Sequence, residues 1–197
     1  MKKICFFDLE TKHLFEDIDS GYPSYSWNKK EMLRPEITKK LGLAYGCVLS
    51  NNEDKFDFEE GSEKALLETL NKFDVVVGHN VIGFDYLVLA PFDERNLLNQ
   101  ISRKTVDTFL KIKEKTGQFA ALNDLGKLNL GLKKTEDSKQ IPKMWAAGDK
   151  QRVRDYCHND VKLVKQLYEL VASKKPLKYY VKNYGEILGT GSLVNLW

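Results

Sequence analysis

The sequence predicts an α/β protein with a mixed β-sheet flanked by helices, on three observations. Three strand-like apolar runs come first, strand and helix patterns then alternate, and the longest helical pattern comes last, over residues 149–172. The chain has 197 residues, of which 42% are hydrophobic and 30% are charged. This balance is typical of a globular domain with a real core.

The first part of the chain predicts three strands separated by one long connection. Residues 3–9 are apolar up to an acidic end and predict a buried strand, and residues 41–49 predict a second. Residues 54–59 alternate in polarity and predict a third strand nearer an edge. Residues 11–40 show no period and predict a connection. Its aromatic residues, which either pack onto the core or stack on single-stranded bases, are Tyr22, Tyr25 and Trp27.

The second part of the chain alternates between helix and strand. Residues 62–72 have helical spacing with Ser62 as a candidate N-cap, and the β-branched run 74–78 predicts a buried parallel strand. A helix over 83–90 and a strand over 104–109 follow. Further helical patterns cover residues 119–130, 142–147 and 149–172, the last with Asp149 as N-cap.

Residues 173–197 form a basic and aromatic C-terminal extension that begins near Pro176. Its lysines either line a groove for phosphates or form a solvated face; they are Lys174, Lys175, Lys178 and Lys182. The net charge of +3 permits a polyanionic partner without requiring one.

The three cysteines are Cys5, Cys47 and Cys157, which lie far apart and form no C-x-x-C pair. This pattern favours neither a zinc site nor a disulfide framework, and it suits a reducing cytoplasm. No segment approaches the roughly 18 apolar residues of a membrane span. We therefore expect a cytoplasmic protein without a membrane partner.

Three acidic residues, Asp8, Glu10 and Asp85, lie at the ends of predicted elements. Asp8 and Glu10 are two apart on a strand, so both side chains project from one face, either as a cation site or as a solvated strand end. Asp85 opens the helix after the buried strand, where a carboxylate also compensates the helix dipole. Just before it, His79 and Asn80 occupy a turn, where a lone histidine is more often hydrogen-bonded than a ligand.

Tyr156 and Asp160 are four apart in the longest helix and therefore share a helix face. A carboxylate beside the core stripe is costly unless it is paired or metal-bound, and a plain Tyr–Asp hydrogen bond is the alternative. Cys157 and His158 are expected to project elsewhere on the helix. The core stripe of this helix comprises Val153, Leu163, Val164 and Leu167.

Four carboxylates gathered at one place would supply the all-oxygen ligation that Mg²⁺ or Mn²⁺ prefers, and two such ions are suited to phosphodiester cleavage. The segments FDLET at 7–11, HNVIGFD at 79–85 and YCHND at 156–160 occur in order. In these segments the chain resembles the DnaQ-like 3′→5′ exonucleases, in their tyrosine-type DEDD form, and especially the exonuclease domains related to family-B DNA polymerases. This resemblance implies a ribonuclease H-like fold, an α/β mixed β-sheet flanked by helices. The segments TVDTF at 105–109 and LNDLGKLNLGL at 122–132 also fit this resemblance.

The resemblance implies roles for individual residues. Asp8, Glu10, Asp85 and Asp160 would hold two Mg²⁺ or Mn²⁺ ions, and Tyr156 would orient the attacking water. Glu10 would also bind the 3′-hydroxyl of the terminal nucleotide. Further substrate contacts are expected from Leu9 as a wedge against the terminal base, and from Thr11, His79 and Asn80. Asp107 is expected to be structural.

The sequence thus predicts a single 3′→5′ exonuclease domain over residues 1–197 that removes nucleotides from DNA. A 3′→5′ exoribonuclease is the first alternative, and a non-catalytic nucleic-acid-binding module is the second. An enzyme that uses Cys157 and His158 as a nucleophilic pair is a remote third. Because no polymerase domain fits this length, the expected partner besides nucleic acid is a separate polymerase, helicase or other nucleic-acid-processing protein.

Overall fold

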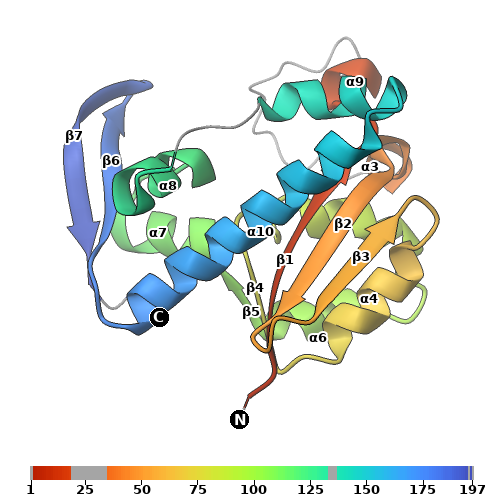
Figure 1. Ribbon diagram of the computed structural model, residues 1–197, viewed down its shortest axis with the longest axis horizontal. Coiled ribbons are helices and arrows are strands. Elements are labelled where there is room, and N and C mark those ends of the chain that lie inside the picture. Colours follow the sequence, from red (N-terminus) through yellow and green to blue (C-terminus); the bar gives the residue numbers. More distant parts are fainter. Residues whose placement is uncertain (1, 19–34, 133–136, 195, 197) are drawn as a thin grey trace.

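A computed structural model describes residues 2–18, 35–132, 137–194 and 196 (Figure 1). Over these residues the strands are β1 (Ile4–Thr11), β2 (Leu43–Ser50), β3 (Lys55–Glu59), β4 (Val75–Gly78), β5 (Thr105–Asp107), β6 (Leu177–Asn183) and β7 (Glu186–Leu193). The α-helices are α1 (Phe15–Ile18), α3 (Pro35–Leu41), α4 (Glu63–Asn71), α5 (Asp85–Leu89), α6 (Leu97–Arg103), α7 (Thr108–Thr116), α8 (Leu122–Leu130), α9 (Ile141–Ala146) and α10 (Lys150–Ala172). Short 3₁₀ helices cover Ala90–Phe92 and Ser138–Gln140.

The main sheet has five strands in the order β3-β2-β1-β4-β5. β2 is antiparallel to both β1 and β3, whereas β4 and β5 continue the sheet on the other side in parallel. The predicted class, an α/β mixed sheet flanked by helices, is therefore confirmed. β1 lies at the centre of the sheet, with two strands on each side of it. Elements from both sides can therefore contact residues at its C-terminal end.

The alternation along β1 divides the core into two layers. Cys5, Phe7 and Leu9 point to one face, where they pack with side chains of α4, α5 and α6. Phe6 points to the opposite face, where the long helix α10 crosses the sheet (Figure 1). By the same alternation, Asp8 and Glu10 point to the α10 face.

Helix α10 covers its face of the sheet with an apolar stripe, and four predicted positions of that stripe are buried: Val153, Leu163, Val164 and Leu167. Its later turns also pack against α7, α8 and β6, in a third apolar cluster. Gly126 of α8 makes this contact close, because a Cβ there would lie 3.0 Å from the Leu163 side chain. The helix is thus fixed along its whole length.

Several local predictions were wrong. The strand predicted over 104–109 ends at Asp107, because the Asp107 carboxylate accepts a hydrogen bond from the Leu110 amide and starts α7. Helices α6, α7 and α3 were not predicted. Ser62 and Asp149 occupy N-cap positions, but neither side chain caps its helix. Ser62 instead donates to the Glu59 carbonyl, and Asp149 pairs with Arg152.

The C-terminal extension forms an antiparallel hairpin of β6 and β7. Figure 1 shows it standing beside α7 and α8, away from the main sheet. Lys182 forms an ion pair in this hairpin, with its Nζ atom 2.7 Å from Asp124 Oδ2. Of the connection predicted over 11–40, the aromatic residues Tyr22, Tyr25 and Trp27 lie outside the described residues. Among the helices described, none is long and apolar enough to cross a membrane.

Candidate metal and catalytic site

The site forms where β1 extends beyond its parallel neighbour. β4 pairs with β1 only from Ile4 to Phe6, and then the chain turns away after Gly78. A Cβ on Gly78 would lie 2.2 Å from Val81 and 3.1 Å from the Phe7 carbonyl oxygen, so the turn requires a glycine. The amide of Leu9 is therefore left without a strand partner on this side, and it donates to Asp85 Oδ1 at 3.0 Å.

This hydrogen bond places the Asp85 carboxylate against the backbone between Asp8 and Glu10. Asp85 is the first residue of α5 and is 3% exposed, so its role goes beyond compensating a helix dipole at the surface. From the other face, α10 presents Tyr156, Cys157 and Asp160. The Cys157 thiol donates to the backbone oxygen of Asp8 at 3.4 Å, which fixes this turn of α10 over the end of β1.

The four acidic side chains lie close enough to repel one another. Burial raises the pKa of Asp8 well above its ordinary value, and the charges of the other three carboxylates raise it further. Burial likewise raises the pKa of Glu10, followed by the charges of Asp160 and Asp85. Burial also raises the pKa of Asp85 to about 7 and that of Asp160 to about 6.

Tyr156 lies beside these carboxylates and is 6% exposed. Its hydroxyl is hydrogen-bonded to Asp160, which counteracts part of the rise in the pKa of that carboxyl. Burial, followed by the nearby negative charges, raises the pKa of the Tyr156 phenol above its ordinary value. The phenol therefore stays protonated at neutral pH, and it acts as a hydrogen-bond donor rather than as a base.

The chemistry of this site fits a divalent cation. Within the described ranges, no lysine, arginine or histidine forms an ion pair with Asp8, Glu10, Asp85 or Asp160. Buried carboxylates without a cationic partner are costly, and cations remove that cost. Ligand atoms of Asp8, Glu10 and Cys157 lie within 4.8 Å of one another, which is close enough to share one ion.

The turn after β4 is held by Asp107, as expected of a structural residue. One carboxylate oxygen accepts from the Asn80 amide at 2.9 Å, and the other accepts from the Ile82 amide at 3.0 Å. Asn80 has a φ of 64°, and its Oδ1 atom would lie 2.4 Å from a Cβ at Gly83. Asp107 thus aligns the segment that carries Asp85.

His79 is a hydrogen-bonded turn residue. Its Nδ1 atom lies 2.8 Å from the Thr108 hydroxyl, and its Nε2 atom lies 3.0 Å from the Ala120 carbonyl oxygen. Burial lowers the pKa of His79 to about 4, so the ring is neutral at pH 7. Both ring nitrogens are engaged by the protein, so His79 helps to position the turn, and its contact with a substrate stays a prediction.

Substrate contacts are expected from two residues of β1, Leu9 and Thr11, and the structure shows what surrounds each of them. Leu9 is 4% exposed and belongs to the core layer on the α4 and α5 side, and its contact with a terminal base stays a prediction. Thr11 is 7% exposed, and its hydroxyl donates to the carbonyl oxygen of His13 at 2.8 Å. All four expected substrate contacts, those of Leu9, Thr11, His79 and Asn80, stay predictions.

The expectation that Cys157 projects away from the carboxylates was wrong, since its thiol contacts Asp8. Its spacing of three from Asp160 puts both on one helix face, a signal that the sequence contained. His158 does face away, toward β2 and β3, where its ring contacts Tyr45 and Asp57. Burial raises the pKa of the Cys157 thiol well above its ordinary value. The two residues therefore do not form a nucleophilic pair.

Comparisons with known proteins support the fold. No protein-family model matches the chain, and no curated protein matches its sequence. Among solved structures, the chain is similar to the family B DNA polymerase from the hyperthermophilic archaeon Pyrobaculum calidifontis, with a TM-score of 0.62 and 16% identity. The match covers 87% of this chain and 25% of that chain. The chain thus shares the fold of one part of a much longer protein.

Proposed function

We propose that this protein is a 3′→5′ exonuclease that uses Mg²⁺ or Mn²⁺ to hydrolyse the terminal phosphodiester of DNA. The observation that carries this proposal is that the carboxylates of Asp8, Glu10, Asp85 and Asp160 lie close enough to interact, with the Tyr156 phenol beside them. Among the residues that the structure describes, no cationic side chain pairs with these carboxylates. The order of the three motifs and the likeness in fold to part of a DNA polymerase support it.

The four carboxylates would hold two ions, which supply activation of a water molecule and stabilisation of charge on the leaving oxygen. The protein itself fixes the positions of these ligands. The Leu9 amide orients Asp85, and the Cys157 thiol ties α10 to the backbone of Asp8. Ligands from a strand and two helices are thereby held on rigid elements.

Tyr156 orients the attacking water by hydrogen bonding. A phenol with a raised pKa does not accept a proton at neutral pH, so the proton of the water leaves to solvent or to a carboxylate. Glu10, on the same strand face as Asp8, would accept a hydrogen bond from the 3′-hydroxyl of the terminal nucleotide. The product is a nucleoside 5′-monophosphate.

A time course on 5′-labelled DNA and RNA oligonucleotides of one sequence, with Mg²⁺ or with EDTA, tests this proposal. We expect a ladder that shortens from the 3′ end, faster on DNA, with mononucleotides released and no reaction in EDTA. The Asp8→Ala variant should bind the oligonucleotide without shortening it. Faster shortening of RNA would assign the protein as an exoribonuclease instead. Binding without any release of mononucleotides would identify a non-catalytic module.

A further inference from the structure

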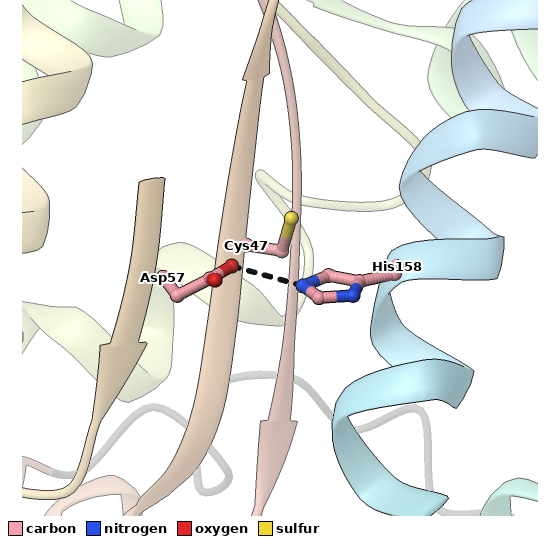
Figure 2. A group of neighbouring side chains, drawn as sticks. All are labelled: Cys47, Asp57 and His158. Carbon is pink, nitrogen blue, oxygen red and sulfur yellow. Dashed lines mark hydrogen bonds and ion pairs between the residues drawn. The ribbon is translucent and has the colours of Figure 1, made fainter. Parts of the chain in front are cut away.

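A second group of ligand-type side chains lies between α10 and the sheet, away from the carboxylates. Figure 2 shows Cys47 from β2, Asp57 from β3 and His158 from α10 gathered at one place. Their ligand atoms lie within 4.8 Å of one another. Cys47 and Asp57 are directly opposed in the β2–β3 pairing, and α10 brings His158 over this pair.

The Nε2 atom of His158 is shared between two neighbours. It lies 2.7 Å from the Tyr45 hydroxyl and 2.9 Å from Asp57 Oδ1. One ring nitrogen has either one proton or one lone pair, so it forms one good hydrogen bond rather than two. The Cys47 thiol is 2% exposed and forms no hydrogen bond to any residue in the described part of the chain. Nitrogen, oxygen and sulfur ligand atoms thus lie close enough together to share one cation.

We propose that Cys47, Asp57 and His158 form a binding site for a divalent transition-metal ion of the zinc class. Sulfur, imidazole nitrogen and a carboxylate oxygen are the donors that Zn²⁺ takes in proteins, with a water in the fourth position. A thiolate, a carboxylate and a neutral imidazole together balance the charge of the ion. An all-oxygen site such as the carboxylate cluster favours Mg²⁺ or Mn²⁺ instead.

The geometry requires only small movements. In a tetrahedral zinc site, ligand atoms lie about 3.3–3.6 Å apart, as follows from Zn–N and Zn–S bonds of about 2.0 and 2.3 Å. The Asp57 and His158 atoms would separate by about 0.4 Å, and the Cys47 sulfur already lies within 4.8 Å of both. The Tyr45 hydroxyl also bonds to Asp57, so it can keep that contact when the ion takes Nε2.

The site has access from solvent on the β3 side. The Asp57 side chain is 42% exposed, whereas that of His158 is 16% exposed. Lys55 is the nearest competitor for Asp57, with its Nζ atom 3.4 Å from Oδ2, and this exposed pair is weak. Burial raises the pKa of the Cys47 thiol to about 12, and an ion must displace that proton on binding. Since the ligands come from three elements, no local spacing of cysteines revealed the site.

Cobalt binding to the metal-free full-length chain tests this proposal, because a thiolate ligand gives Co²⁺ an intense near-ultraviolet charge-transfer band. We expect the band in the wild-type protein, its removal by Zn²⁺, and a rise in Tm on adding Zn²⁺. The variants Asp57→Asn and His158→Gln should bind Co²⁺ at least about tenfold more weakly, and Cys47→Ser should lose the band. The matched control is Cys157→Ser, in which the other buried thiol of this face is removed and the band should persist.

Two results would overturn the proposal: no charge-transfer band in the wild-type protein, or a band that is lost in Cys157→Ser and kept in Cys47→Ser. The second result would place the ion among the carboxylates. If Cys47→Ser does not fold by circular dichroism, the exposed Asp57→Asn substitution decides the outcome. Release of mononucleotides with Mg²⁺ alone is measured separately, so this proposal and the proposed function can fail independently.

Discussion

Asp85 allows the electrostatic cost of the carboxylate cluster to be measured directly. In the Asp85→Asn variant, the oxygen that accepts from the Leu9 amide is kept, while the charge is removed. Burial raises the pKa of Asp85 from 3.8 to about 7, and one pKa unit corresponds to about 1.4 kcal/mol. Ionised Asp85 therefore costs the metal-free protein on the order of 4 kcal/mol at pH 8, and the variant recovers this.

The sign follows from proton linkage. The folded pKa is raised, so the folded protein holds a proton that the unfolded chain has lost between about pH 4 and pH 7. Stability of the metal-free wild type therefore falls as pH rises through this window. The cost at pH 5 is only on the order of 1.5 kcal/mol, so the advantage of the variant should grow by roughly 3 kcal/mol between pH 5 and pH 8.

Urea unfolding in EDTA at both pH values, followed by circular dichroism, measures this difference. Asp155→Asn is the control, since Asp155 is an exposed carboxylate of α10 and its loss should change stability little. An Asp85→Asn variant that is no more stable than wild type at pH 8, or whose advantage does not depend on pH, would refute the reasoning. Addition of Mg²⁺ should stabilise the wild type more than the variant.

Three further substitutions have defined outcomes. Tyr156→Phe removes a hydrogen-bond donor but no ligand, so steady-state release of mononucleotides should fall about 10- to 100-fold, less than in Asp160→Asn; an equal loss in both variants would contradict a purely orienting role. Asp107→Ala leaves three backbone amides without their acceptor and should lower the free energy of unfolding by about 3 kcal/mol in urea titrations. Leu9→Ala should cost about 2–5 kcal/mol in the same assay, whereas a change below about 1 kcal/mol would indicate a surface role.

The alternation of a strand made part of the site predictable. Spacing by two places Asp8 and Glu10 on one face in any strand, and the same rule sends Leu9 to the other face. The predicted mixed sheet is also confirmed, because the apolar runs in the sequence were long enough to define its strands. The wedge expected of Leu9 came from the resemblance rather than from this alternation, and it stays a prediction.

Convergence of residues from distant segments needs the order of strands, which residue patterns alone do not supply. Asp85 reaches β1 because β4 is its parallel neighbour and ends earlier. The motif resemblance, rather than spacing, joined Asp85 and Asp160 to Asp8. The group of Cys47, Asp57 and His158 has no such motif and emerged only from the pairing of β2 with β3. That residues 1–197 act as one exonuclease domain stays a prediction.

The hairpin of β6 and β7 was missed because its turn has an unusual sequence. Tyr184 and Gly185 both have positive φ, 48° and 86°, in the short turn that joins the strands. Such turns are typically signalled by Asn-Gly or Asp-Gly, and tyrosine is rare at the first position. The basic composition of residues 173–197 indicated a charged surface instead of a hairpin. In the structure, Lys182 of this segment contacts Asp124.

Anomalous scattering from crystals grown with Mn²⁺ and a nucleoside 5′-monophosphate tests the central claim most directly. The account predicts two peaks, roughly 3.5–4 Å apart, bounded by Asp8, Glu10, Asp85 and Asp160, with the phosphate against them. Crystals of Asp8→Ala should lose at least one peak. A map in which Mn²⁺ binds elsewhere, or leaves these four carboxylates without any peak, would contradict it.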